Sequence, residues 1–278
     1  MTLPRLRAMT PADVDAASDA LLRNDWGDRR ANFRFAAEHP ECVAFVADAA
    51  GAIVGTGIAT VNGPVGWIGT IWVDPEWRRR GLGMALTQAT IDAAEGAGCR
   101  TLVLVATDAG LPMYQRIGFE VQTEYRILEA PGLGGGVPDP RIRAFRRDDL
   151  DTLAAMDRAA TGEDRRHLLG TFARPDTARC VIRSDGSIGG FVIRAPWGGG
   201  ATIAPDPVDA ATILRARRVA AGPEKRVRAG LLAENVEGIR MLLADGWTAA
   251  WEGPRLIRGE PLDWHPGSIW GQFNHAMG

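Results

Sequence analysis

The chain of 278 residues contains an internal repeat, and this repeat limits the folds that are open to it. The segment RLRAMTPADVDAASDALL starts at Arg5, and a similar segment, RIRAFRRDDLDTLAAMDRAA, starts at Arg141, about 136 residues later. Each copy has the pattern of a short alternating strand followed by an amphipathic helix. Two copies of one such arrangement predict two similar domains rather than a single continuous core.

Two further matches follow in the same order along the chain. Strand-like runs around a turn rich in Asp and Gly begin at Cys42 and again at Cys180, a pattern typical of β-hairpins. The segment GLPMYQRIGFE from Gly110 corresponds to VEGIRMLLADGWT from Val236, where a short helix ends on glycine before another strand. We therefore predict domains over residues 1–130 and 141–278, joined by a linker rich in glycine and proline over residues 131–140.

Composition excludes several classes of protein. The 34 acidic and 32 basic residues nearly cancel to a net charge of −2, which argues against a chain that binds nucleic acid through a broad positive field. No run approaches the roughly 20 apolar residues that cross a membrane, so we expect no membrane partner and a cytoplasmic location. Three scattered cysteines and four histidines lack the spacing of metal ligands, so we expect no bound metal.

The first copy predicts an α/β fold with a mixed sheet. Its pattern is strand, helices, hairpin, the strand WIGTIWV, a helix, the strand TLVLVAT, a short helix and the strand VQTEYRIL. The helix after the arginine-rich segment repeats apolar residues at Leu82, Leu86, Ala89 and Ala93, a stripe that can pack on the sheet before Gly96 ends the helix.

The most informative motif is WRRRGLGMAL, from Trp77 to Leu86. A strand leads into Arg78, Arg79, Arg80, Gly81, Leu82 and Gly83 and then into a helix, whose first backbone N–H groups have no helical partner. The helix dipole favours an anion there, and the two glycines permit close backbone approach, so the motif predicts a pyrophosphate site. The G-x-x-x-x-G-K-[ST] motif of nucleotide triphosphatases is absent, and a dinucleotide fingerprint would need a glycine at Leu86.

The turn R-x-x-G-x-G at Arg78–Gly83, followed by Tyr114 and then Gly118-Phe119, resembles the GCN5-related N-acetyltransferases (GNAT). The resemblance runs from Arg5 to about Leu128 and implies two tandem GNAT-like domains, each a mostly antiparallel sheet flanked by helices. It implies that the turn binds the pyrophosphate of acetyl-CoA and that the preceding strand pairs with the pantetheine arm. The cofactor-binding residues that it implies are Ile71, Trp72, Val73, Arg78, Arg79, Arg80, Gly81, Leu82, Gly83 and Met84.

Tyr114 is the predicted catalytic residue. A phenol with a pKa of about 10 is protonated at neutral pH and can donate a proton to the CoA thiolate as it leaves, the role that the family resemblance implies. Packing behind the cofactor is the alternative role. We expect a backbone N–H near Trp72 or Val73 to polarise the thioester carbonyl, since a strand irregularity often frees one. The general base stays unassigned, because the strand GWIGTIWV contains no carboxylate.

The second copy lacks these catalytic parts. Where the pyrophosphate turn should stand it has ATIAPDPVDAATILRA, with Pro205 and Pro207 and no paired glycines, and Leu242 stands where the tyrosine would be. This half is expected to support the first or to shape the acceptor site. The predicted substrate residues are Asp25 and Trp26 in the first copy and Asp164 and Arg165 in the second. Core packing for Trp26, and helix caps for the charged residues, are the alternatives.

Together these features predict an N-acetyltransferase that moves the acetyl group of acetyl-CoA to a primary amine of a small molecule by direct attack in a ternary complex. A catalytically silent CoA-binding sensor or assembly module is the alternative, because the strand glutamate of many relatives is missing.

Overall fold

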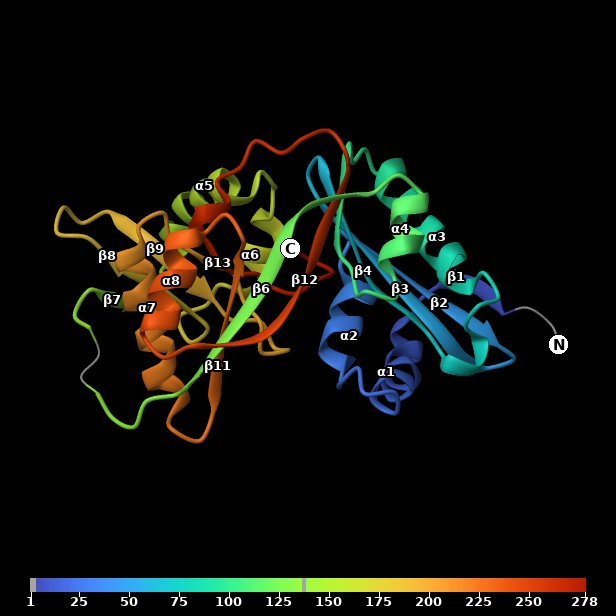
Figure 1. Ribbon diagram of the computed structural model, residues 1–278, viewed down its shortest axis with the longest axis horizontal. Coiled ribbons are helices and arrows are strands. Elements are labelled where there is room, and N and C mark those ends of the chain that lie inside the picture. Colours follow the sequence, from blue (N-terminus) through green and yellow to red (C-terminus); the bar gives the residue numbers. More distant parts are fainter. Residues whose placement is uncertain (1–3, 137–138) are drawn as a thin grey trace.

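The computed structural model describes residues 4–136 and 139–278, so residues 1–3 of the predicted first domain and 137–138 of the predicted linker lie outside it. Two layered α/β halves lie side by side in Figure 1, and long strands cross between them. The strands are β1 (Arg5–Ala8), β2 (Cys42–Ala49), β3 (Ala52–Asn62), β4 (Val65–Val73), β5 (Thr101–Val105), β6 (Glu120–Pro131), β7 (Ile142–Ala144), β8 (Ala178–Ile182), β9 (Ile188–Ile193), β10 (Thr202–Ile203), β11 (Arg226–Leu232), β12 (Thr248–Gly259) and β13 (Ile269–Gly271). The helices are α1 (Val14–Leu22), α2 (Arg30–Glu38), α3 (Leu82–Gly96), α4 (Leu111–Arg116), α5 (Leu150–Thr161), α6 (Arg166–Phe172), α7 (Pro207–Ala221) and α8 (Val236–Ala244).

The two segments of the predicted internal repeat make similar contacts at their starts. At the start of the first half, Arg7 makes a two-pronged ion pair with Asp13, with N–O distances of 2.8 and 2.7 Å. In the second half Arg143 pairs with Asp149 in the same way, at 2.7 and 2.8 Å. Both pairs join a short edge strand to the turn before a helix, so the two similar sequence segments form the same local structure.

The strands form two sheets, and the larger one is mixed. Its order is β1-β2-β3-β4-β5-β12-β6-β11, and the smaller sheet has the order β13-β10-β9-β8-β7. Among the strand pairs of the described residues, β4 and β5 are parallel and the others are antiparallel. The α/β class with mostly antiparallel sheets is therefore confirmed.

The two halves exchange their last long strands. β12, from the second half, pairs antiparallel with β5 of the first half. β6, from the first half, pairs antiparallel with β11 of the second half, and β6 and β12 pair with each other. Figure 1 shows these three strands crossing the middle of the molecule. The pairing of β6 with β11 therefore continues the sheet from the first half into the second. Gly132, in the predicted linker at residues 131–140, also donates its N–H to Lys225 O at 2.7 Å. The division into two domains remains a prediction.

Helix α3 packs on one face of the first-half sheet, and α1 and α2 pack on the other (Figure 1). The buried face of α3 consists of Leu82, Leu86, Thr87, Thr90, Ile91 and Ala94. It includes the predicted Leu82 and Leu86, whereas the predicted Ala89 and Ala93 are only partly buried. The helix ends at Gly96, as the sequence predicted.

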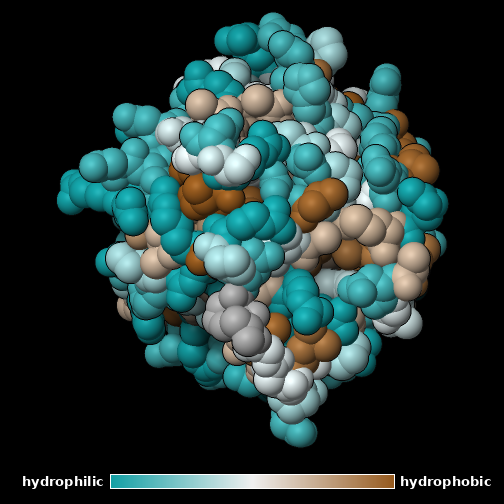
Figure 2. Space-filling model, turned by 90° about the vertical axis from the view of Figure 1, so that its left-hand side faces the viewer, coloured by the Kyte–Doolittle hydropathy of each residue, from teal (hydrophilic) through white to brown (hydrophobic). Residues whose placement is uncertain are grey.

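The outer face of the second half is mainly hydrophilic. Figure 2 shows apolar residues there as separate patches between polar ones. Several large exposed apolar side chains of the chain, Val208, Val236 and Leu243, belong to the helices α7 and α8 of this half. Scattered apolar residues of this kind are ordinary on a protein surface.

Candidate active site

The glycine turn after β4 leaves the start of α3 open. Gly81 has a φ of +81°, a left-handed conformation that favours glycine, and it precedes the helix as its N-cap. The first hydrogen bond of the helix runs from Ala85 N to Gly81 O at 3.0 Å, so the N–H groups of Leu82, Gly83 and Met84 come before it. No side chain among the described residues caps this end, which keeps the N–H groups available to an anion.

The three arginines of the turn do not share one role. Arg78 Nε donates to Val73 O at 3.0 Å, and Arg78 and Gly83 both line the large cavity described below. Arg79 has a φ of +60°, and Arg80 lies over the ring of Trp77 at 5.4 Å. Neither Arg79 nor Arg80 lines that cavity. Only Arg78 among them is therefore placed at its wall.

Strand β4 separates from β5 beside this turn. The parallel pairing runs only from Val65 and Thr101 to Trp67 and Val103. Beyond it, residues 68–73 border the cavity along an edge that β5 no longer covers. The strand is also irregular here, because Thr70 has a φ of +51° and the register with β3 shifts. We expected such an irregularity near Trp72 or Val73, and the structure places it at Thr70.

Tyr114 lies on the other side of the opening that forms where β4 and β5 separate. It belongs to α4, is 8% exposed and lines the cavity, and its ring meets Phe119 edge to face with ring centres 6.1 Å apart. Burial raises the pKa of the Tyr114 phenol to about 12, although a hydrogen bond with the Thr87 side chain lowers the pKa slightly. The phenol is therefore protonated throughout the neutral range and can act as a proton donor.

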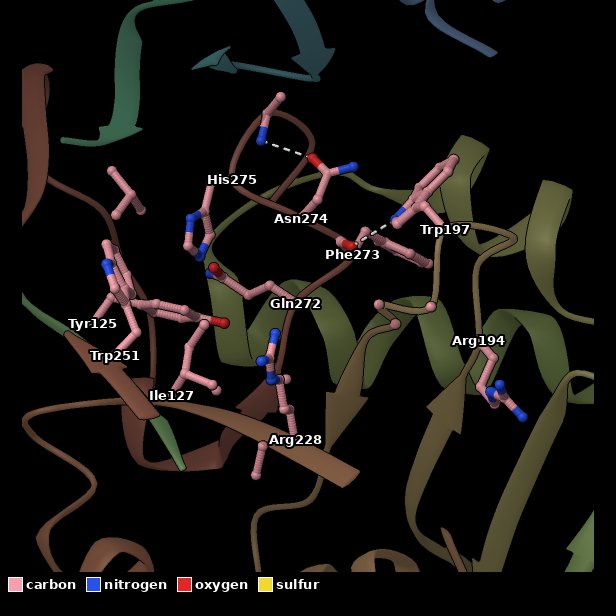
Figure 3. A pocket seen from close by; sticks show the side chains of 18 of the residues that line it. Tyr125, Ile127, Arg194, Trp197, Arg228, Trp251, Gln272, Phe273, Asn274 and His275 are labelled. Atoms are coloured by element: carbon pink, nitrogen blue, oxygen red, sulfur yellow. Dashed lines mark hydrogen bonds between the residues drawn. The ribbon is translucent and has the colours of Figure 1, made fainter. Parts of the chain in front are cut away.

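The opening leads into one cavity of about 1660 Å³ that both halves line. Figure 3 shows an aromatic wall on which Tyr125, Trp251 and His275 cluster beside Ile127. The His275 ring meets Tyr125 edge to face at 4.9 Å and lies 5.3 Å from Trp251. Burial, together with the nearby charge of Arg29, lowers the pKa of His275 to about 4, so the ring is neutral at pH 7.

The segment after β13 holds His275 against the irregular part of β4. A Cβ atom on Gly69 would lie 2.4 Å from the His275 carbonyl oxygen, so only glycine allows this approach. Thr60 Oγ1 donates to Ala276 O at 2.8 Å, and Asn62 Nδ2 donates to Met277 O at 3.0 Å. His275 was not among the residues predicted from the sequence, and no motif surrounds it, because its position follows from these distant contacts.

The predicted substrate residues lie in different places. Trp26 lines the cavity, whereas Asp25 is exposed outside its wall. Asp164 pairs with Arg158, and its backbone N–H donates to Asn62 O at 3.1 Å. Arg165 is 1% exposed, and neither it nor Asp164 lines the cavity.

Arg165 is part of a buried polar group between the halves. Its Nε and Nη2 donate to the two carboxylate oxygens of Asp157 at 2.9 and 2.6 Å. The neighbouring Glu163 accepts from Trp67 Nε1 at 2.9 Å and from Asn62 Nδ2 at 2.8 Å. These positions favour a structural role for Asp164 and Arg165 over the direct substrate contact that we had predicted.

The second half has no open anion turn in the equivalent place. Asp206 caps the start of α7 with its own side chain, which accepts from Val208 N at 2.7 Å, and Pro207 lacks an N–H group. Leu242 is buried in the position that corresponds to Tyr114, and Trp247 N donates to Leu242 O just as Phe119 N donates to Tyr114 O. Among the described residues no group of His, Cys, Asp and Glu side chains is arranged to hold a metal ion.

The class of this protein follows from the glycine turn, the split strands and the tyrosine taken with its sequence relatives. Residues 9–119 match the family model described as "Acetyltransferase (GNAT) family", so the first half of the chain is similar to the GNAT acetyltransferases. It is accordingly an acetyl-CoA-dependent acyltransferase. None of the helices in the part of the chain that the structure describes is both long and apolar enough to span a membrane.

Individual relatives support this class. YitH of Bacillus subtilis, described as an uncharacterized N-acetyltransferase, is 29% identical over 220 residues, which is 76% of each chain. A glucosamine 6-phosphate N-acetyltransferase of Trypanosoma brucei brucei is 36% identical over 65 residues, 23% of this chain and 44% of the relative. Two solved structures share the fold at low identity. A proposed acetyltransferase of Pyrococcus horikoshii has a TM-score of 0.83 at 18% identity. The match covers 99% of this chain and 95% of the Pyrococcus chain. A tandem GNAT protein from the clavulanic acid biosynthesis pathway has a TM-score of 0.58 at 15% identity, with coverages of 94% and 100%.

Proposed function

We propose that this protein transfers the acetyl group of acetyl-CoA to a primary amine of a small molecule, by direct attack within a ternary complex. One observation carries the proposal: a single cavity connects the glycine turn and Tyr114 with a chamber walled by the second half. A cofactor at the turn and an acceptor in the chamber would therefore meet inside one enclosed space, which suits a direct reaction. The amino-sugar substrate named for the Trypanosoma relative supports a small-molecule acceptor.

The residues of the turn suit the pyrophosphate of acetyl-CoA. The open N–H groups of Leu82, Gly83 and Met84 and the positive end of the α3 dipole favour two linked phosphates. The uncovered edge of β4, residues 68–73, offers backbone groups to a pantetheine arm. These features of the chain itself fit the cofactor that the family uses.

The chemical step needs two proton movements. The amine nitrogen forms a bond to the acetyl carbon, the carbon–sulfur bond breaks, and the sulfur leaves as a thiolate. Tyr114 is proposed to donate its phenolic proton to that sulfur and to regain a proton from solvent. His275 is proposed to accept the proton that the amine loses, since its ring is neutral and borders the cavity. An amine that arrives neutral needs only this weak base.

Calorimetric titration with acetyl-CoA tests the first step. We expect one site per chain, because the second half lacks an open turn. Gly83→Glu places a negative charge at the pyrophosphate position and should abolish binding. Gly96→Glu is the matched control, since it adds the same side chain at the far end of α3, where a Cβ atom would have no atom of the described residues within 4 Å. Two equivalent sites, or equal binding by both variants, would contradict the assignment.

Tyr114→Phe tests the second step. The ring and its packing remain while the proton donor is lost, so turnover should fall about 10²-fold or more with acetyl-CoA affinity nearly unchanged. The measurement is thiol release from acetyl-CoA with a panel of amines that includes amino sugars and amino acids. If the protein binds acetyl-CoA and releases no thiol with any class of amine, the silent CoA-binding module replaces the enzyme.

A further inference from the structure

The cavity is strongly basic, in contrast to the chain as a whole. Nine of its lining residues are arginine or lysine, and three are acidic: Glu129, Asp139 and Asp176. The whole chain carries a net charge of −2, so this excess of positive charge is local to the cavity. Seven of the nine basic residues come from the second half, which has no open pyrophosphate turn. Acetyl-CoA at the first-half turn therefore does not account for them.

Several of these cations already have partners. Glu129 pairs with Arg226 at 2.8 Å and with Arg228 at 3.2 Å. Arg179 donates to the carbonyl oxygens of Pro175 and Ala178 at 2.6 and 2.8 Å. By contrast, no ion pair or side-chain hydrogen bond joins Arg194 or Arg217 to any other residue that the structure describes.

Arg217 is the most deeply placed of the unpaired cations. It lies on α7, is only partly open to the cavity, and is close enough to Arg194 to be affected by its charge. Burial is the main reason that the pKa of Arg217 falls to about 10, and the charge of Arg194 adds to the effect. Arg194 follows β9, and Figure 3 shows its side chain at the border of the pocket, across from Arg228 and Gln272. Two such cations without a carboxylate suit an anion from outside the chain.

We propose that Arg194 and Arg217 bind an anionic group of the acceptor, so that the acceptor is an amine that also carries a carboxylate or a phosphate. This inference rests on the proposed acetyl transfer, because it names the class of acceptor for that same cavity. Arginine suits both groups, since its planar fork donates two parallel hydrogen bonds. The second half would then contribute acceptor selection, while the first half holds the cofactor.

Direct anion binding provides a test that does not depend on turnover. The protein saturated with CoA is titrated with inorganic phosphate and, separately, with malonate, and the rise in its melting temperature is followed. We expect a rise with phosphate, malonate or both, and the two titrations separate a phosphate-binding from a carboxylate-binding site. Arg217→Gln and Arg194→Gln should each weaken this binding about tenfold or more. Arg217→Lys, which keeps the charge, should retain part of it.

Arg240→Gln is the matched control, since Arg240 is exposed on α8 and does not line the cavity. It should bind both anions as the unmodified protein does. The proposal is overturned if neither anion binds to the CoA-loaded protein, or if Arg217→Gln and Arg240→Gln bind them equally.

Matched pairs of acceptors connect the anion site with catalysis. Each pair differs only in the anion: an amino acid against its amide, and glucosamine 6-phosphate against glucosamine. We expect kcat/KM at least about tenfold higher for the anionic member of one pair, and loss of this preference in Arg217→Gln. Equal rates within both pairs would overturn the acceptor assignment and leave acetyl transfer intact. Anion binding without acetylation of any amine would overturn the proposed function and leave the anion site intact.

Discussion

The substitution Asp157→Asn tests whether Arg165 holds the two halves together or contacts the substrate. Arg165 donates to both carboxylate oxygens of Asp157, and the two side chains are 0% and 1% exposed. Asparagine keeps the shape of the side chain but removes its negative charge. Arg165 would then keep a buried positive charge without its carboxylate. Removing one partner of a buried ion pair costs about 3–5 kcal/mol.

This loss is large beside a typical free energy of unfolding of about 5–15 kcal/mol. With a urea dependence of about 3 kcal/mol per molar, it lowers the unfolding midpoint by about 1 M or more. The assay is urea unfolding, followed by tryptophan fluorescence and by far-ultraviolet circular dichroism. The control is Asp151→Asn on the same helix, where the carboxylate pairs with Arg166 and its side chain is 82% exposed. There the change should stay within about 0.5 kcal/mol.

Two results would refute this reasoning. One is a loss of stability below about 1 kcal/mol in Asp157→Asn. The other is an acceptor KM that rises in Arg165→Met combined with Asp157→Leu while stability is preserved, because an apolar pair of similar volume should restore the packing. In the second case Arg165 would contact the acceptor, as its place in the sequence first suggested.

Two further predictions concern the segment around His275. Gly69→Ala should destabilise the protein by about 1–3 kcal/mol, because the new Cβ atom would lie 2.6 Å from the backbone of Ala276. The control Gly96→Ala, at an uncrowded position of α3, should be neutral or stabilising in the same urea assay. Equal effects of the two substitutions would contradict the packing described here. The pKa of His167 and of His275 is about 4 in the folded protein, against 6.5 for the free side chain, so the unfolded chain binds more protons between these values. The free energy of unfolding should therefore fall as the pH drops from about 6.5 to 4. The upper limit is about 1.4 kcal/mol per pH unit for each ring. The actual loss should be smaller, because both rings are partly exposed to solvent. His275→Gln should reduce that slope in unfolding experiments between pH 7.5 and 4.5, and an unchanged slope would count against a neutral His275.

The local features of this protein were predictable from its sequence. The repeated segments at Arg5 and Arg141, the glycine turn at Gly81 and the short helix with Tyr114 are each recognisable within one short segment of neighbouring residues. Backbone conformation and helix capping depend on neighbouring residues, so the sequence by itself indicates the turn and the helix that follows it. For the same reason the missing turn of the second half was visible as Pro205 just before α7 and Pro207 at its first position.

Only the tertiary structure decided how the halves join. The pairing of β5 with β12 and of β6 with β11 is the reverse of what two separate domains would make, and both arrangements fit the same alternating strand patterns. The cavity depends on that exchange, since β12 carries Trp251 into the cavity wall beside Tyr125 of β6. Arg194 lies just after β9 and Arg217 lies on α7, and in the sequence each looks like an ordinary surface charge. The pairing of strands and the burial of charged side chains depend on contacts between residues that are distant in the sequence. The periodicity within one segment does not indicate which distant residues it will contact.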